Sequence, residues 1–77
     1  MQKWEYCEIV YNGGTLVGGE QYKLIIHHLP EDIVSDIKGE MISSTITQLG
    51  LDGWELVSAY EEKFGHKRYW FFKRPLQ

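Results

Sequence analysis

The spacing of hydrophobic and polar residues changes twice along the chain. Four stretches are rich in β-branched and aromatic residues, which is typical of β-strands. They span residues 4–11, 22–28, 54–60 and 67–73. Pro75 should end the last strand, because proline has no N–H to donate to a sheet ladder.

Between the second and third predicted strands, apolar residues recur at spacings of three and four, as on one face of a helix. Pro30 suits the first helical position, and Glu31 and Asp32 would lie in a first turn that favours anions. Gly39 inside the pattern permits a kink or a break. The apolar positions of this predicted helix are Ile33, Val34, Ile37, Met41, Ile42, Ile46 and Leu49.

The stretch 49–57 joins the predicted helix to the third strand. Gly50 lies where a left-handed C-cap is expected, and Leu51 follows where such a cap places its apolar contact. Asp52-Gly53 is then a turn, since glycine reaches positive φ without a clash. The sequence therefore predicts a single α+β domain over residues 1–77, with a four-stranded antiparallel sheet (ββαββ) and one helix packed on one face.

The predicted strands are apolar on both sides, whereas a solvated sheet face alternates with polar residues. In the last strand, Trp70 and Phe72 point to one face, and Tyr69 and Phe71 point to the other. One helix covers one face, so the second face would expose a large apolar patch. We expect another copy of the chain to cover it, most simply in a two-fold dimer. The alternative is that long Lys, Arg and Tyr side chains drape over it.

Composition narrows the class of protein. Among 77 residues, 43% are hydrophobic, which is enough for a core in one small domain. No apolar run approaches the roughly 20 residues of a membrane span, and the first residues lack the apolar segment of a signal peptide. The single cysteine, Cys7, favours a reducing compartment and a role as a small buried hydrophobe. We expect a cytoplasmic protein without a membrane partner.

Charge is distributed unevenly along the chain. Residues 1–62 hold all 11 acids and three of the eight Lys/Arg, a net charge of −8. Residues 63–77 hold the other five basic residues and no acid, a net charge of +5. Such asymmetry suits an anionic ligand or an acidic surface of a neighbouring subunit. The acidic total argues against binding to duplex nucleic acid.

The C-terminal strand interleaves cationic and aromatic side chains. Guanidinium groups fork onto phosphate or carboxylate, and aromatic rings stack on planar bases. The alternative is an edge strand with core aromatics and solvated flanking charges. The ligand-binding candidates in this run are His66, Arg68, Tyr69, Trp70, Lys73 and Arg74.

Four glycines, Gly13, Gly14, Gly18 and Gly19, lie between the first two strands. Their backbone N–H groups could wrap a phosphate, or the segment could form a lid over a ligand. The segment lacks the Gly-Lys-Ser/Thr ending of a P-loop, so an ordinary hairpin loop is the alternative. The adjacent pair His27-His28 would point to opposite sheet faces and could not readily chelate one metal. We predict no metal, no cofactor and no catalytic residue.

Three motifs resemble a small bacterial and phage family, the domain of unknown function 4177. They are Lys3-Trp4-Glu5-Tyr6, the stretch from Leu49 to Val57, and Phe72-Lys73-Arg74-Pro75. The stretch 10–28 is longer than expected for that family. The resemblance implies no established activity. The size and phage distribution of the family are similar to those of small oligomeric proteins that sequester nucleotide immune signals, an analogy of fold and context alone.

These observations favour a non-enzymatic homo-oligomer that binds a small anionic, nucleotide-like ligand, in the manner of a phage sponge for an immune signalling nucleotide. Its partner would be itself, as a homodimer or a higher homo-oligomer. The alternative function is an adaptor whose second apolar sheet face, or open edge, receives a partner protein. A third hypothesis is that the protein is an enzyme.

Overall fold

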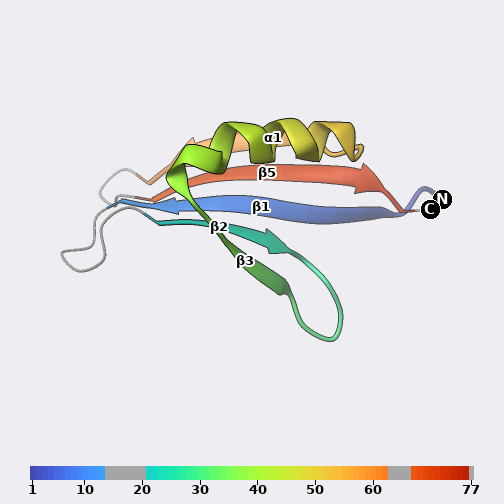
Figure 1. Cartoon of the computed structure of the whole chain (residues 1–77). Helices are drawn as coiled ribbons and strands as arrows, with labels where there is room; N and C mark the ends of the chain where they lie inside the picture. Colours follow the sequence, from blue (N-terminus) through green and yellow to red (C-terminus); the bar gives the residue numbers. More distant parts are fainter. Residues whose placement is uncertain (14–20, 63–66, 77) are drawn as a thin grey trace.

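The computed structural model describes residues 1–13, 21–62 and 67–76. Its five strands form one antiparallel sheet in the order β3-β2-β1-β5-β4, with one α-helix (Figure 1). The α+β class is confirmed, whereas the predicted number of four strands is wrong. The strands are β1 (Trp4–Asn12), β2 (Gln21–Ile26), β3 (Ile33–Ile37), β4 (Glu55–Glu61) and β5 (Lys67–Pro75).

The additional strand is β3, which was predicted as the first part of the helix. It pairs with β2 in antiparallel register, with Ile33 opposite Ile26 and Ile37 opposite Tyr22. Pro30 follows a cis peptide bond in the connection between β2 and β3, and does not begin a helix. The β-branched residues of this stretch pack well on a pleated surface, and a neighbouring strand is present to pair with them. The helix prediction for 33–37 is therefore wrong.

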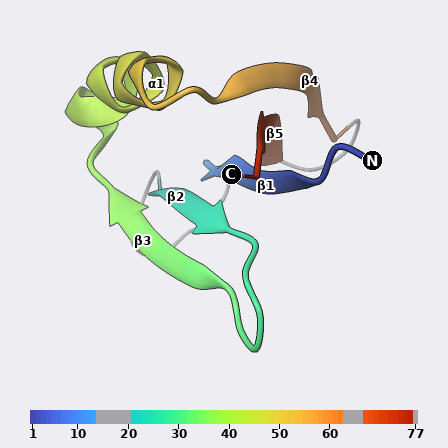
Figure 2. The ribbon, with the colours of Figure 1, turned by 90° about the vertical axis from the view of Figure 1, so that its right-hand side faces the viewer.

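The later part of the predicted helix is confirmed. The chain breaks at Gly39 into a short 3₁₀ turn, η1 (Gly39–Met41), and continues as α1 (Ile42–Leu51). Figures 1 and 2 show α1 along one side of the sheet, while no described residue forms a helix over the opposite side. We call the side opposite α1 the open face.

The helix ends in a Schellman motif centred on Gly53, which has φ of 90°. The N–H of Gly53 donates to the carbonyl of Gly50 (3.1 Å), and the N–H of Trp54 donates to the carbonyl of Leu49 (2.9 Å). Leu49 and Trp54 are both buried and supply the apolar contact of the motif. The prediction of Gly50 as the cap is wrong, and Leu51, expected to make that contact, is 76% exposed.

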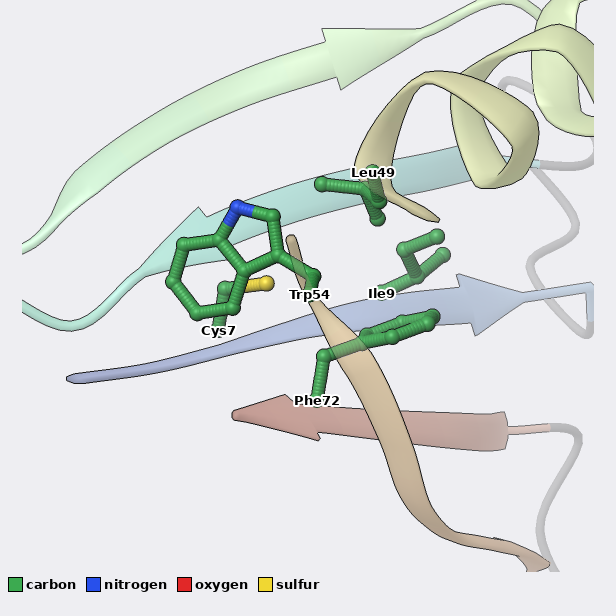
Figure 3. Packing of buried hydrophobic residues seen from close by; sticks show 5 residues of the cluster. All are labelled: Cys7, Ile9, Leu49, Trp54 and Phe72. Atoms are coloured by element: carbon green, nitrogen blue, oxygen red, sulfur yellow. The ribbon is translucent and has the colours of Figure 1, made fainter. Parts of the chain in front are cut away.

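The core lies between the sheet and α1. Its fully or nearly buried residues come from β1, β5, α1 and the turn before β4, and Figure 3 shows them facing one another. The register places Cys7 of β1 between Ile26 of β2 and Phe72 of β5. Among the described residues, the buried hydrophobic side chains are Cys7, Ile9, Leu49, Trp54 and Phe72. This core is small, and it belongs to one face of the sheet.

Candidate functional site

Strand β5 divides the predicted ligand-binding residues between the two faces of the sheet. Arg68, Trp70 and Arg74 alternate in phase with buried Phe72 and so lie on the α1 side. Tyr69 and Lys73 are out of phase with Phe72 and lie on the open face. The predicted residues therefore do not converge on one surface.

Arg74 is bound within its own chain. Its Nε donates to Glu5 Oε1, and its Nη1 donates to the backbone carbonyl of Asp52 at 2.9 Å. The guanidinium also lies 4.3 Å from the centroid of the Trp54 ring. Arg74 thus ties β1 and β5 to the turn that follows α1. A hollow of about 370 Å³ beside it is lined by Glu5 and Asp52 as well, and two carboxylates there do not favour an anion.

Arg68 is held more loosely. Its Nε lies 2.8 Å from Glu61 Oε2, and the side chains are 58% and 65% exposed. The guanidinium carbon lies 5.8 Å from the centroid of the Tyr11 ring. Gly13 lies against the same ring, so closely that a Cβ at Gly13 would overlap the Tyr11 side chain. Exposed ion pairs contribute about 0–1 kcal/mol, so an anion could displace Glu61 from Arg68.

A hollow of about 240 Å³ brings part of the predicted site together at the β4–β5 hairpin. It is lined by Arg68, Tyr69 and Trp70 from β5, and by Ala59, Tyr60 and Glu61 from β4. Arg68 and Trp70 share the α1 side of β5, and a guanidinium with an aromatic ring on the same face suits a nucleotide-like anion, whereas the Glu61 carboxylate opposes one. Lys73 and Arg74 lie outside this hollow.

The open face carries a cluster of aromatic rings. Tyr60 and Tyr69 stack with centroids 4.8 Å apart and planes 20° apart, and Phe71 lies 6.1 Å from Tyr60 at 10°. Nearby, the Lys73 ammonium lies 4.2 Å from the centroid of the Trp4 ring. Together with Tyr6, which is 50% exposed, we call these rings the open-face cluster: Trp4, Tyr6, Tyr60, Tyr69 and Phe71.

Tyr60 is the member of this cluster that the sequence pattern misplaces. Strict alternation from Trp54 would put Leu56 and Tyr60 on the same face. A β-bulge between Leu56 and Ser58 shifts the register, so Leu56 pairs with Phe72 while Tyr60 pairs with Tyr69. A signal was nevertheless present, because aromatic residues favour aromatic partners across antiparallel strands.

A hydrogen bond fixes the outer end of the cluster. The Tyr69 hydroxyl donates to Glu62 Oε1 at 3.0 Å. This bond to a carboxylate raises the pKa of Tyr69 above its ordinary value. The hydroxyl is therefore protonated at neutral pH and can donate this bond.

Cys7 and His27 show two different environments for potentially reactive groups. Cys7 is fully buried, and burial raises the pKa of its thiol to about 11, so the thiol is protonated at neutral pH. His27 lies between two carboxylates, with Nε2 3.5 Å from Glu8 Oε1 and Nδ1 3.4 Å from Asp32 Oδ2. Over residues 1–13, 21–62 and 67–76, no group of three or more His, Cys, Asp or Glu could hold a metal ion.

Four of the predicted site residues, Gly14, Gly18, Gly19 and His66, lie outside the described residues. The predicted lid and the imidazole of the C-terminal run therefore stay predictions. In the part of the chain that the structure describes, no helix has the length and apolarity needed to cross a bilayer.

No family model matches this chain, and neither a curated protein nor a solved structure matches it. The resemblance to the domain of unknown function 4177 stays a prediction that rests on three sequence motifs.

Proposed function

We propose that this chain is a non-enzymatic binding protein that assembles as a homo-oligomer, with the open-face cluster at the contact between copies. The observation that carries the proposal is a row of stacked rings on a sheet face with no helix over it. Exposed apolar patches rimmed by polar groups are typical of interaction surfaces.

A second copy is the partner that the open face fits best. In a two-fold contact the same patch meets itself, so the rings of one cluster would pack on those of the other. The half of the face built by β2 and β3 carries both charge signs, with Lys23 opposite Asp36. Charged side chains beside an aromatic patch are usual at the polar margin of a specific interface.

Sedimentation equilibrium of the wild type and two matched variants tests this proposal. Phe71→Lys places a charge in the cluster, whereas Leu51→Lys places the same charge at an exposed position at the end of α1. We expect a multiple of 9.1 kDa for the wild type and Leu51→Lys, and a folded monomer for Phe71→Lys. A wild-type monomer at millimolar concentration, or equal dissociation of both variants, would contradict it.

A second candidate function is the binding of a nucleotide-like anion in the hollow at the β4–β5 hairpin. It is favoured by Arg68 and Trp70, which lie on the same side of β5 and both line this hollow. The phosphate would replace Glu61 at Arg68, and the base would stack on the Trp70 ring.

Calorimetric titration with adenosine monophosphate tests this second candidate. Arg68→Gln should weaken binding at least tenfold, Glu61→Gln should strengthen it, and the remote control Lys38→Gln should leave it unchanged. Equal affinity of the wild type and Arg68→Gln would exclude this hollow as the nucleotide site.

A further inference from the structure

We infer that the outer edge of β4 is a docking site for an extended peptide segment of a partner protein, basic at both ends and apolar in the middle. The segment would add to the sheet as a sixth strand. The site shares only Tyr60 with the open-face cluster and uses the backbone edge of β4, so the inference does not depend on self-association.

The position of β4 provides the unpaired edge. It is the last strand of the sheet, and β5 is its only pairing partner among the residues that the structure describes. All residues of Glu55–Glu61 are exposed. Every second residue of such an edge strand directs its N–H and C=O away from the sheet, where another strand can pair with them.

The chain itself contains a strand that fits β4. In the β4–β5 register, Glu55 lies opposite Lys73 and Glu61 lies opposite Arg68. The second of these pairs forms the 2.8 Å contact between carboxylate and guanidinium. Trp70, opposite Ala59, belongs to the apolar middle of β5. Strand β5 therefore has basic residues near both ends and apolar residues in the middle. This order matches the acidic ends and the apolar middle of β4.

The same two carboxylates can serve the outer edge. Side chains of a strand stand roughly perpendicular to the sheet and can reach a neighbour on either side. Glu55 and Glu61 are both exposed, and Leu56 and Tyr60 between them are 56% and 52% exposed. An incoming strand with Lys or Arg opposite these glutamates would gain favourable cross-strand pairs, each contributing about 0.2–1 kcal/mol.

A second copy of this chain is a poor occupant of the edge. Antiparallel pairing of β4 with itself about Ser58 would place Glu55 opposite Glu61 at both ends, and like charges directly opposite destabilise a sheet. The other sheet edge, β3, contains Asp36 and follows Asp32. Between Ile33 and Ile37 it has no basic residue to pair with the acids of β4. Strand β5 has no free edge, because β1 and β4 flank it. Charge thus selects a different, basic chain.

The β-bulge in β4 limits the docking segment. It lies between Leu56 and Ser58, so Ser58–Glu61 is the regular part of the edge. Bulges and charges on edge strands discourage non-specific pairing. A short regular stretch supplies few ladder hydrogen bonds, so we expect the affinity to depend on the basic ends and to fall as salt rises.

Fluorescence anisotropy with a labelled octapeptide, Lys-Arg-Thr-Val-Thr-Val-Lys-Arg, tests the inference. We expect it to bind at least tenfold more tightly than the same peptide with glutamate in place of each basic residue. The double variant Glu55→Gln/Glu61→Gln should lose this preference. The double variant Glu31→Gln/Glu40→Gln, with the same change in charge at exposed positions, should keep it. Equal loss in both double variants would show non-specific attraction and overturn the inference.

Amide hydrogen exchange locates the bound peptide and does not depend on the stability of the variants. We expect saturating basic peptide to slow exchange within Ser58–Glu61 of the wild type and to leave α1 unchanged. Protection elsewhere without protection of β4 would overturn the inference. The Phe71→Lys variant should bind the peptide like the wild type, so failure of self-association and failure of edge docking can be distinguished.

Discussion

The two faces of the sheet are built by the same strands, yet their aromatic residues have different surroundings. Phe72 is 4% exposed and lies in the core with Cys7 and Ile9 under α1. Its neighbour Phe71 lies on the open face, where it stacks beside Tyr60, a ring that is itself 52% exposed. The residue types are alike on both sides. Among the described residues, a helix covers only one side, and we therefore propose that a second copy of the chain covers the other.

The basic side chains of β5 also have different surroundings on the two faces. On the covered side, Arg74 joins a carboxylate, a backbone carbonyl and the Trp54 ring. On the open side, Lys73 lies over the Trp4 ring. That contact is the draping of a long side chain expected as the alternative to a dimer. It covers one ring of the open-face cluster, while the stacked rings of Tyr60, Tyr69 and Phe71 lie further along the face.

The two faces should differ most in how strongly the loss of an aromatic ring destabilises the fold. Phe72→Ala removes a core ring and should lower the free energy of unfolding by about 3–5 kcal/mol. Phe71→Ala should cost the isolated chain far less, because its surroundings are partly solvent. Urea denaturation at a concentration below that of self-association measures both. Equal losses would mean that the two faces are equally buried.

The buried thiol of Cys7 makes the stability of the folded chain depend on pH. The pKa of Cys7 rises from 9.0 to about 11 in the folded chain because burial disfavours the thiolate. Its contribution to stability is therefore complete below pH 9 and is lost as the pH rises to 11, by about 2 kcal/mol. Denaturation curves at pH 8 and pH 11 should show this loss in the wild type and not in Cys7→Ala. The same pH dependence in both proteins would contradict it.

The two arginines of β5 should differ in a smaller but measurable way. Arg74→Gln leaves Glu5 and the Asp52 carbonyl without their donor and should cost about 1–2 kcal/mol. Arg68→Gln breaks an exposed ion pair and should cost less than about 0.5 kcal/mol. Thermal unfolding in low and high salt measures both effects. A larger loss for Arg68 would reverse the assignment of Arg74 as the structural cation.

The smallest effects are expected at the helix end. Gly53→Ala forces a side chain into positive φ and should destabilise by about 1 kcal/mol. Gly50→Ala should stabilise by up to about 1 kcal/mol, because Gly50 lies inside α1 and a Cβ there would meet nothing within 4 Å. Thermal unfolding of the two variants should therefore shift in opposite directions. Shifts in the same direction would contradict the Schellman motif at Gly53.

Local residue patterns predicted much of the fold. The α+β class, four of the strands, the helix after Gly39 and the end of β5 at Pro75 all agree with the structure. Strand β3 was missed because its apolar residues fit a helical period at Ile33, Val34 and Ile37. Its pairing with β2 joins residues across the connection 27–32, and spacings within one stretch do not reveal such a pairing. The strand propensity of these β-branched residues and their pairing with β2 outweigh the helical spacing.

The candidate site was harder to predict than the fold. Alternation along β5 correctly separates Tyr69 from Trp70. The sequence does not show that Arg74 reaches the carbonyl of Asp52, because that contact depends on how α1 ends over the sheet. The bulge after Leu56 likewise decides the face on which Tyr60 lies. One extra residue in a strand moves all the following side chains to the opposite face of the sheet, and the alternation of the sequence does not reveal this change.

Isotope-filtered nuclear Overhauser measurements on a mixture of labelled and unlabelled chains test the central claim most directly. We predict contacts between subunits at the ring protons of Tyr60, Tyr69 and Phe71, and none at Phe72, which is enclosed within its own chain. Contacts between subunits that bypass the open-face rings, or a sample with no such contacts at millimolar concentration, would contradict the claim that a second copy covers the open face.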